Sequence, residues 1–218
     1  MRSRFDEQLQ QLDHEMIEMG SLCEEVIALS VSALTDGRTE LLPRVALRDR
    51  EIDRKEREIE SLCMRLLLQQ QPVASDLRQI SAALKMITDM ERIGDQAEDI
   101  AEIVPFLDRH GTDDHTPMKD MAVAVIKMVT DSVDAYVKRD ITLAQAVIDH
   151  DDIVDEAFLR VKGRLIEMIA ADPTDGEYAL DLLMVAKYLE RIGDHATNLA
   201  EWVIYAVTGI HKDKEEMV

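Results

Sequence analysis

Aromatic, glycine, proline and cysteine residues are all scarce in this sequence. Only 4% of its 218 residues are aromatic, and it contains 8 glycines, 5 prolines and 2 cysteines. This composition speaks against a sheet protein with many tight turns, whereas abundant Ala, Leu, Ile, Met and Glu favour helices packed on helices. The hydrophobic fraction of 46% is sufficient for a buried core. Composition therefore favours an all-α fold.

Positive charge is scarce as well. Lys and Arg total 25 against 45 Asp and Glu, which gives a formal net charge of -20. A nucleic-acid partner would require a Lys/Arg surface, and the densest basic run is only residues 160–164. No apolar run approaches the length of a membrane span. We therefore expect no nucleic-acid partner and no direct membrane insertion, so that any contact with a membrane would go through a partner.

The two cysteines, Cys23 and Cys63, lie far apart, and each falls within an amphipathic helix pattern. This arrangement is typical of reduced, partly buried thiols in a cytosolic protein. A redox pair is the less favoured alternative.

Apolar residues recur every three or four positions along nearly the whole chain, which is the periodicity of amphipathic helices. The pattern predicts six helices, at residues 4–34, 39–70, 75–107, 116–138, 141–171 and 176–208. We expect Asp36 and Gly37 to end the first helix, and Ser75 and Thr174 to cap later helices. The segment from Pro105 to Pro117 is the one clear linker in the sequence.

The two halves of the chain repeat each other. The run Glu91–Asp95 returns letter for letter as Glu190–Asp194, and residues 33–53 align without a gap on residues 135–155. Each copy of such a repeat is one supersecondary unit that covers its apolar face by packing on a neighbour. Long helices with short connections lie antiparallel, so we expect two tandem three-helix up-down-up bundles, at residues 1–111 and 112–218.

Carboxylates recur in pairs four residues apart within each repeat. The pairs are Asp49 and Asp53 with Glu91 and Asp95 in the first half, and Asp151 and Asp155 with Glu190 and Asp194 in the second. This spacing places both members of a pair on one helix face, about 5–6 Å apart at Cβ, where like charges repel. Glu91 and Asp95 extend an apolar stripe, and Gly94 and Gly193 leave room beside the pairs for a close neighbour or a ligand.

If the second and third helices of a repeat are antiparallel neighbours, their two pairs meet at one level and place four carboxylates around one point. A multivalent cation stabilises such a convergence, which is otherwise costly. The alternative is a solvated surface on which Arg92 or Arg191 neutralises the acids in exposed ion pairs. The presence of in-register pairs in both halves favours the cation site.

All-oxygen ligands suit hard cations such as Mg²⁺, Ca²⁺, Mn²⁺ or ferric iron. The Glu-x-x-His motif of ferritin-like di-iron proteins is missing. His195 points about 100° away from Asp194, so we expect an interface role for it rather than metal ligation. Asp99 and Asn198 occupy matching positions in the two repeats, and for these two both a ligand role and a hydrogen-bonding role beside the ligands stay open.

No grouping of nucleophile, base and acid is apparent, and no Gly-rich loop follows a strand. We therefore do not expect an enzyme. Two alternatives stay open. A carboxylate-bridged metalloenzyme would use the same acids to activate water or oxygen on a metal. A metal-storage bundle would bind metal without any protein partner.

The two Glu-Arg-Ile-Gly-Asp copies, their continuations through Glu102 and Glu201, and the upstream Asp-x-x-x-Asp pairs resemble the PhoU family of phosphate-transport regulators. The resemblance covers essentially the whole chain. It implies two three-helix bundles side by side, a homodimer, and multinuclear metal clusters held by the repeated motifs. By this resemblance the first cluster is formed by Asp49, Asp53, Glu91 and Asp95, and the second by Asp151, Asp155, Glu190 and Asp194.

The resemblance also implies a function. It suggests a cytoplasmic negative regulator that links the phosphate ABC transporter ATPase to the phosphate-sensing histidine kinase, so that the phosphate-starvation genes stay off when phosphate is plentiful. Such a protein would be peripheral to the inner membrane through these partners, and its metal would be iron, manganese, magnesium or zinc. One departure is that the family usually has Asn where the first repeat has Asp99, preceded here by Glu98. The first site is therefore expected to be more negative than the second.

Overall fold

The computed structural model describes residues 2–69, 72–107 and 116–210. In these residues the chain forms six α-helices and two short 3-10 helices, and no strand occurs. The elements are α1 (Arg2–Thr35), η1 (Thr39–Leu41), α2 (Leu42–Gln69), α3 (Ala74–Leu107), α4 (Thr116–Lys138), α5 (Ile141–Ala171), η2 (Pro173–Asp175) and α6 (Gly176–Thr208). The prediction of an all-α fold with six long helices is confirmed.

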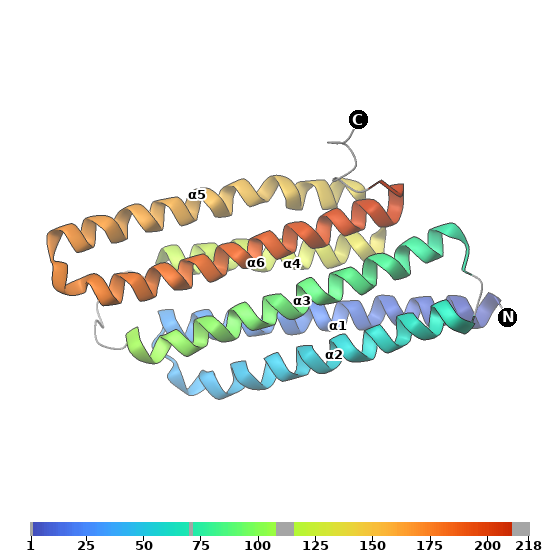
Figure 1. Ribbon diagram of the computed structural model, residues 1–218, viewed down its shortest axis with the longest axis horizontal. Coiled ribbons are helices and arrows are strands. Elements are labelled where there is room, and N and C mark those ends of the chain that lie inside the picture. Colours follow the sequence, from blue (N-terminus) through green and yellow to red (C-terminus); the bar gives the residue numbers. More distant parts are fainter. Residues whose placement is uncertain (1, 70–71, 108–115, 211–218) are drawn as a thin grey trace.

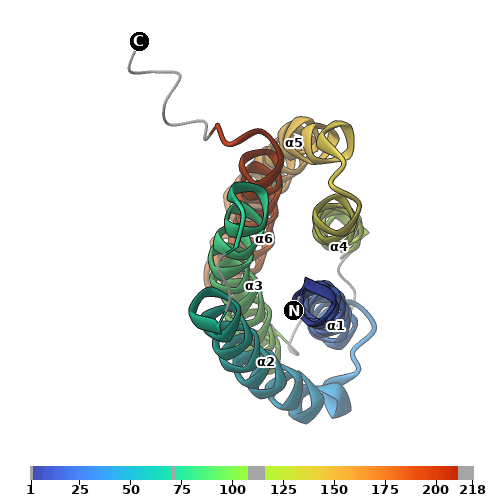
Figure 2. The same cartoon turned by 90° about the vertical axis from the view of Figure 1, so that its right-hand side faces the viewer.

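The helices form two layers (Figures 1 and 2). Helices α2, α3, α6 and α5 stand side by side in that order as a curved row, and α1 and α4 cover one face of the row. Within the first half, α1, α2 and α3 all contact one another, and α4, α5 and α6 do the same in the second half. The two three-helix bundles then join through α3 against α6 and α1 against α4. The predicted domain boundary, between residues 111 and 112, falls outside the described residues.

Several helix ends differ from the sequence-based expectation. Ser75 lies inside α3, and Thr174 lies inside η2, where its amide donates to the Asp172 carboxylate at 2.9 Å. The predicted linker is also too long, because Pro105 belongs to α3 and Pro117 to α4. Pro117 lies in the first turn of α4, where proline is tolerated because its missing N–H would have no intrahelical partner.

The end of α1 follows the expectation. Gly37 adopts a φ of 65°, a left-handed conformation that favours glycine, and the Asp36 amide donates to Ser32 O at 3.1 Å.

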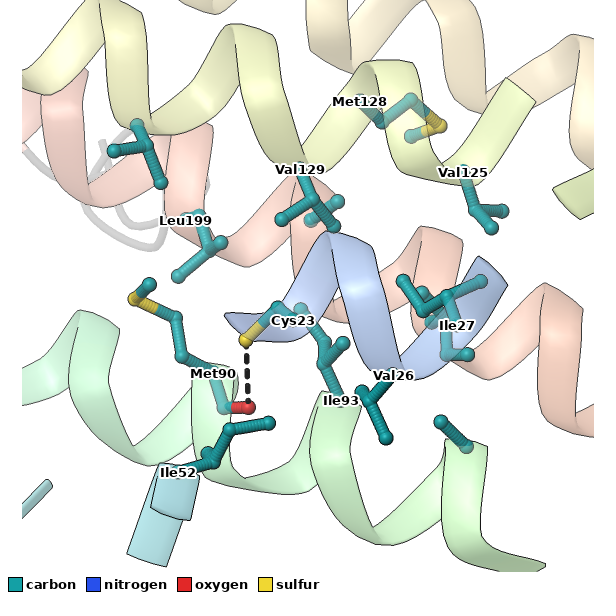
Figure 3. Packing of buried hydrophobic residues seen from close by; sticks show 14 of the residues in the cluster. Cys23, Val26, Ile27, Ile52, Met90, Ile93, Val125, Met128, Val129 and Leu199 are labelled. Atoms are coloured by element: carbon teal, nitrogen blue, oxygen red, sulfur yellow. Dashed lines mark hydrogen bonds between the residues drawn. The ribbon is translucent and has the colours of Figure 1, made fainter. Parts of the chain in front are cut away.

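A single hydrophobic core runs through both halves. Figure 3 shows its centre, where Cys23 of α1 packs with Met90 and Ile93 of α3, Val129 of α4 and Leu199 of α6. All five side chains are fully buried, and the Cys23 thiol donates to Met90 O at 3.4 Å. Each repeat depends on the other, because each covers its apolar face by packing against its neighbour.

Both thiols are free, as expected, and they are fully buried where partial burial was expected. Burial raises the pKa of Cys63 to about 12 and that of Cys23 further still. Among the described helices, none combines the length and the apolar character needed to cross a bilayer.

Candidate metal centre

Each half contains one close helix crossing, and both crossings are centred on a glycine. A Cβ added to Gly94 of α3 would lie 3.1 Å from Asp49 Oδ1 and 3.1 Å from a methyl carbon of Ile52, both on α2. A Cβ added to Gly193 of α6 would lie 3.4 Å from Asp151 Oδ1 on α5. We call these the first crossing and the second crossing. The expectation that the repeated glycine makes room for a close neighbour is confirmed, and the neighbour is a carboxylate.

Asp49 is the most buried acid at the first crossing. Asp49 is only 8% exposed, and its Oδ1 atom has no hydrogen-bond partner among the described residues. Burial raises the pKa of this carboxyl to about 7, helped by the negative charges of Glu98, Asp53 and Asp95. A buried carboxylate oxygen with no donor is costly unless a proton or a cation satisfies it.

The partner pair on α3 lies at the same crossing. Burial and the nearby charge of Asp95 raise the pKa of Glu91, and the Asp53 carboxylate adds to this effect. The alternative of neutralisation by arginine is realised in part, because Arg92 contacts Asp95 at 2.8 Å and Glu91 at 3.4 Å. Arg92 is 55% exposed, however, and such pairs contribute little to stability. A cation could therefore displace the arginine at small cost.

The second crossing repeats this arrangement with less burial of its aspartates. The pKa of Asp151 is raised to about 6 by burial and then by Asp194, Asp155 and Glu190. Burial and the Glu190 charge likewise raise the pKa of Asp194. Lys187 forms an ion pair with Glu190, as Arg92 does with the acids of the first crossing. The four predicted acids of the second half thus influence one another electrostatically, as do those of the first half.

The carboxylates of each crossing are neighbours, but they are not drawn together as a set of metal ligands. Within the described parts of the chain, no three Asp, Glu, His or Cys side chains converge closely enough to hold one ion. The eight predicted ligands are grouped by the two helix crossings, and their convergence on a metal stays a prediction.

Asp99 and Asn198, whose roles the sequence left open, have different surroundings. Burial raises the pKa of Asp99, helped by Glu102 and Asp95, so Asp99 adjoins the first group of acids. Asn198 instead donates to Asp89 Oδ1 on α3 at 3.1 Å. The Nδ1 atom of His195 lies 2.9 Å from the same oxygen, which confirms the interface role expected for this histidine.

Glu98 is a member of the first group that the sequence analysis did not include among the ligands. It influences Asp49 more strongly than Asp53 or Asp95 does. Its position was visible in the sequence, because it lies seven residues after Glu91 and therefore on the same face of α3. The equivalent residue in the second half is Thr197, so the first crossing carries the additional negative charge.

The paired crossings and the doubled three-helix architecture can be compared with known proteins. A family model described as the PhoU domain matches this chain twice, at residues 16–104 and 118–203. The chain belongs to the PhoU family. The first match contains Asp49, Gly94 and Asp95, and the second contains Asp151 and Asp194.

Individual relatives match along almost the full length. The phosphate-specific transport system accessory protein PhoU homolog of Clostridium acetobutylicum is 38% identical over 216 residues, which covers 97% of this chain and 98% of the relative. The homolog of Pseudomonas aeruginosa is 35% identical over 94% of this chain and 86% of its own length. These relatives are named as accessory proteins of a transport system and not as enzymes, which agrees with the expectation for this chain.

Solved structures agree on the fold. The crystal structure of PhoU from Pseudomonas aeruginosa superposes with a TM-score of 0.89 at 34% sequence identity, covering 94% of this chain and all of that one. The phosphate transport system regulatory protein PhoU from Streptococcus pneumoniae gives a TM-score of 0.86 at 24% identity, covering 95% and 98% of the two chains. The PhoU-like architecture predicted from the repeat is therefore confirmed.

Proposed function

We propose that this protein is a negative regulator of phosphate uptake and of the phosphate-starvation response, which couples the phosphate ABC transporter to its sensor histidine kinase. The observation that carries the proposal is the near full-length match to accessory proteins of the phosphate-specific transport system, with both copies of the repeat included. Its partners are the transporter ATPase and the kinase. The protein acts in the cytoplasm as a homodimer, and it reaches the inner membrane only through these partners.

We further propose that each crossing holds an oxygen-ligated metal ion. The ligands are Asp49, Asp53, Glu91 and Asp95 at the first crossing, and Asp151, Asp155, Glu190 and Asp194 at the second, with Asp99 beside the first. The chemistry of the donors fits this role, since iron, manganese, magnesium and zinc all accept carboxylate ligands. The unsatisfied Asp49 Oδ1 and the raised pKa of Asp49 support it, because a cation would satisfy that oxygen and offset the repulsion.

When bound, such an ion supplies positive charge that neutralises the clustered carboxylates. In this proposal the carboxylates of α2 and α3 would hold an ion at the first crossing, and those of α5 and α6 would hold one at the second. With their charges neutralised, the paired helices would be held together at the glycine crossings, and the helix faces available to a partner would be fixed.

The regulatory proposal is tested by gene deletion and complementation. Deletion should raise expression of phosphate-starvation genes in high phosphate, and wild-type protein should restore repression. The purified protein should also bind the cytoplasmic region of the kinase. Normal repression in a deletion strain that has no second copy of the gene would show that this chain shares the family's fold without its role.

The metal proposal is tested by the double variant Asp95→Asn with Asp194→Asn, which is nearly isosteric. It should keep the helical circular dichroism signal while bound metal, measured by elemental analysis, falls well below that of the wild type. Asp152→Asn is the matched control, since Asp152 is an exposed aspartate beside Asp151 that the proposal does not use. Equal metal content in the wild type and both variants would mean that these acid pairs are solvated surface residues and not metal ligands.

Two further measurements separate the alternatives. Turnover assays on the metal-loaded protein test a carboxylate-bridged metalloenzyme. A pull-down from phosphate-replete cells tests a metal-storage bundle, which would bind metal but recover neither the transporter ATPase nor the kinase. Light scattering on the purified protein tests the homodimer.

A further inference from the structure

A small cavity of about 90 Å³ lies where α3, α4 and α6 meet, and both halves of the molecule contribute residues to its lining. Its lining includes Arg78 and Gln79 of α3, Tyr136 of α4, Arg139 of the turn after α4, and Val203 and Ala206 of α6. Arg78 lies 13 positions before Glu91 on α3, a separation of about 20 Å along a helix. The cavity is therefore remote from the carboxylates of the two crossings.

Two guanidinium groups line this one cavity. The Nε atom of Arg78 donates to Ala206 O at 3.3 Å, and Arg139 donates to Gln79 Oε1. Among the described residues neither arginine forms an ion pair, although the chain has 45 carboxylate side chains and only 25 Lys and Arg. Two like charges at one small cavity repel each other, and an anion between them would offset that repulsion.

The backbone at Arg139 supports a role for its side chain. Arg139 has a φ of 53°, the left-handed conformation that L side chains rarely adopt, at the turn that ends α4. The helix ends at Gly37 and Gly209 adopt the same conformation with glycine, for which it carries no steric penalty. An arginine at this position therefore accepts backbone strain while placing a guanidinium at the cavity.

Neighbouring groups hold this guanidinium in place. Gln79 is only 4% exposed, and its backbone carbonyl accepts a hydrogen bond from the Tyr136 hydroxyl at 3.3 Å. Its side-chain amide donates to Asp13 Oδ1 on α1 at 2.9 Å while its oxygen accepts from Arg139. Asp13 therefore lies on the other side of the Gln79 amide. It forms no ion pair with either arginine in the part of the chain that the structure describes, but the charge of Arg139 opposes the rise that burial causes in the pKa of Asp13.

We propose that this cavity binds one small oxyanion, such as inorganic phosphate or the phosphoryl group of a phosphorylated side chain, through Arg78 and Arg139. Planar guanidinium groups match tetrahedral oxyanions through paired N–H donors. Ser75, in the first turn of α3, also lines the cavity, and its hydroxyl donates to Asp76 Oδ1 at 3.4 Å. The helix dipole favours negative charge at this end of α3. The volume corresponds to about three waters and is far below the roughly 300–1,000 Å³ of pockets for larger ligands.

The test is isothermal titration of the full-length, metal-free protein with inorganic phosphate at low ionic strength, where no metal-bound anion contributes. The wild type should show one saturable site per chain. Arg139→Gly should weaken binding at least about tenfold, a loss of one strong charge-assisted contact, without lowering the melting temperature, because glycine relieves the strain at this φ. Arg139→Lys, which keeps the charge but loses the paired donors, should bind with intermediate affinity.

Lys162→Gln is the matched control, since Lys162 is an exposed α5 cation remote from the cavity, and it should bind phosphate like the wild type. A parallel titration with phosphoserine distinguishes the sources. Tighter binding of free phosphate identifies the ion, whereas tighter binding of phosphoserine identifies a modified side chain. No saturable binding of either by the wild type, or unchanged binding by Arg139→Gly, would overturn the proposal. These outcomes do not depend on the regulatory function, which the deletion strain tests separately.

Discussion

Asp49→Asn should stabilise the metal-free protein at pH 8, although the substitution removes a side chain that is central to the first crossing. The reason is that ionised Asp49 is buried beside Glu98, Asp53 and Asp95, which raises its pKa to about 7. Asparagine has nearly the same shape and no charge. Its amide can donate to the neighbouring carboxylates, whereas the aspartate can only repel them.

The magnitude follows from proton linkage. The pKa of Asp49 is about 7 in the folded protein against a reference value of 3.8, an interval of roughly three pH units. At about 1.4 kcal/mol per unit, the ionised carboxylate destabilises the folded state by roughly 4 kcal/mol above pH 7. After allowance for imperfect hydrogen bonding of the new amide, we expect a gain of about 2–4 kcal/mol, or roughly 4–16 °C in melting temperature.

The sign depends on pH. Because the folded pKa is raised, the favourable contribution of Asp49 is complete below pH 3.8 and is lost as the pH rises through about 7. The variant and the wild type should therefore differ most at pH 8 and converge towards pH 4. Urea denaturation of chelator-treated protein at several pH values measures this difference, with Asp152→Asn as the exposed control.

Added metal should reverse the order. A cation at the first crossing stabilises the wild type by mass action but has lost a ligand in Asp49→Asn. The prediction is contradicted if Asp49→Asn is less stable than the wild type in chelator at pH 8, or if the difference in stability between the two proteins does not change with pH. Either result would mean that the Asp49 carboxylate is already satisfied in the metal-free protein.

Three other predictions concern the packing. Gly94→Ala should lower the free energy of unfolding by roughly 1–3 kcal/mol in denaturant titrations, because its Cβ would lie 3.1 Å from the Asp49 carboxylate. Gly193→Ala, whose Cβ would meet its neighbours at 3.4 Å, should lower it by less than about 1 kcal/mol. Equal losses in the two variants would contradict the difference between the crossings. Met90→Ala empties a fully buried position and should lose about 2–5 kcal/mol in the same assay. With the Cys63 thiol buried and its pKa near 12, neither cysteine should react with a thiol reagent at pH 8 until denaturant is added.

The helices were predictable because each carries a long periodic apolar stripe, and burial of such a stripe dominates the choice of local structure. Their ends were less predictable, because several side chains can compete for the same free amides. At the start of η2, Asp172 accepts from Thr174, so the residue expected to cap is itself the donor. Pro105 could not be placed within α3 from its local preference alone.

The candidate site was predictable in its grouping but not in its detail. Helical spacing was sufficient to group the eight carboxylates by the two crossings. The degree of burial depends on how closely α2 approaches α3, which the sequence indicates only through the missing side chain of Gly94. The influence of Glu98 on Asp49 crosses from one helix to another, and spacing along a single helix cannot measure it.

The two crossings share a motif, but they should not bind a cation equally. At the first, Asp49 is 8% exposed and Glu98 adds a carboxylate. At the second, the three aspartates are more exposed than their counterparts, and Thr197 replaces Glu98. The pKa values of about 7 for Asp49 and about 6 for Asp151 express the same difference. Cation binding releases more free energy where it relieves more repulsion between carboxylates. With equal coordination, the first crossing should therefore bind a cation more tightly than the second. Removal of metal should then destabilise the first half more than the second, because the acids it leaves behind are the more deeply buried ones.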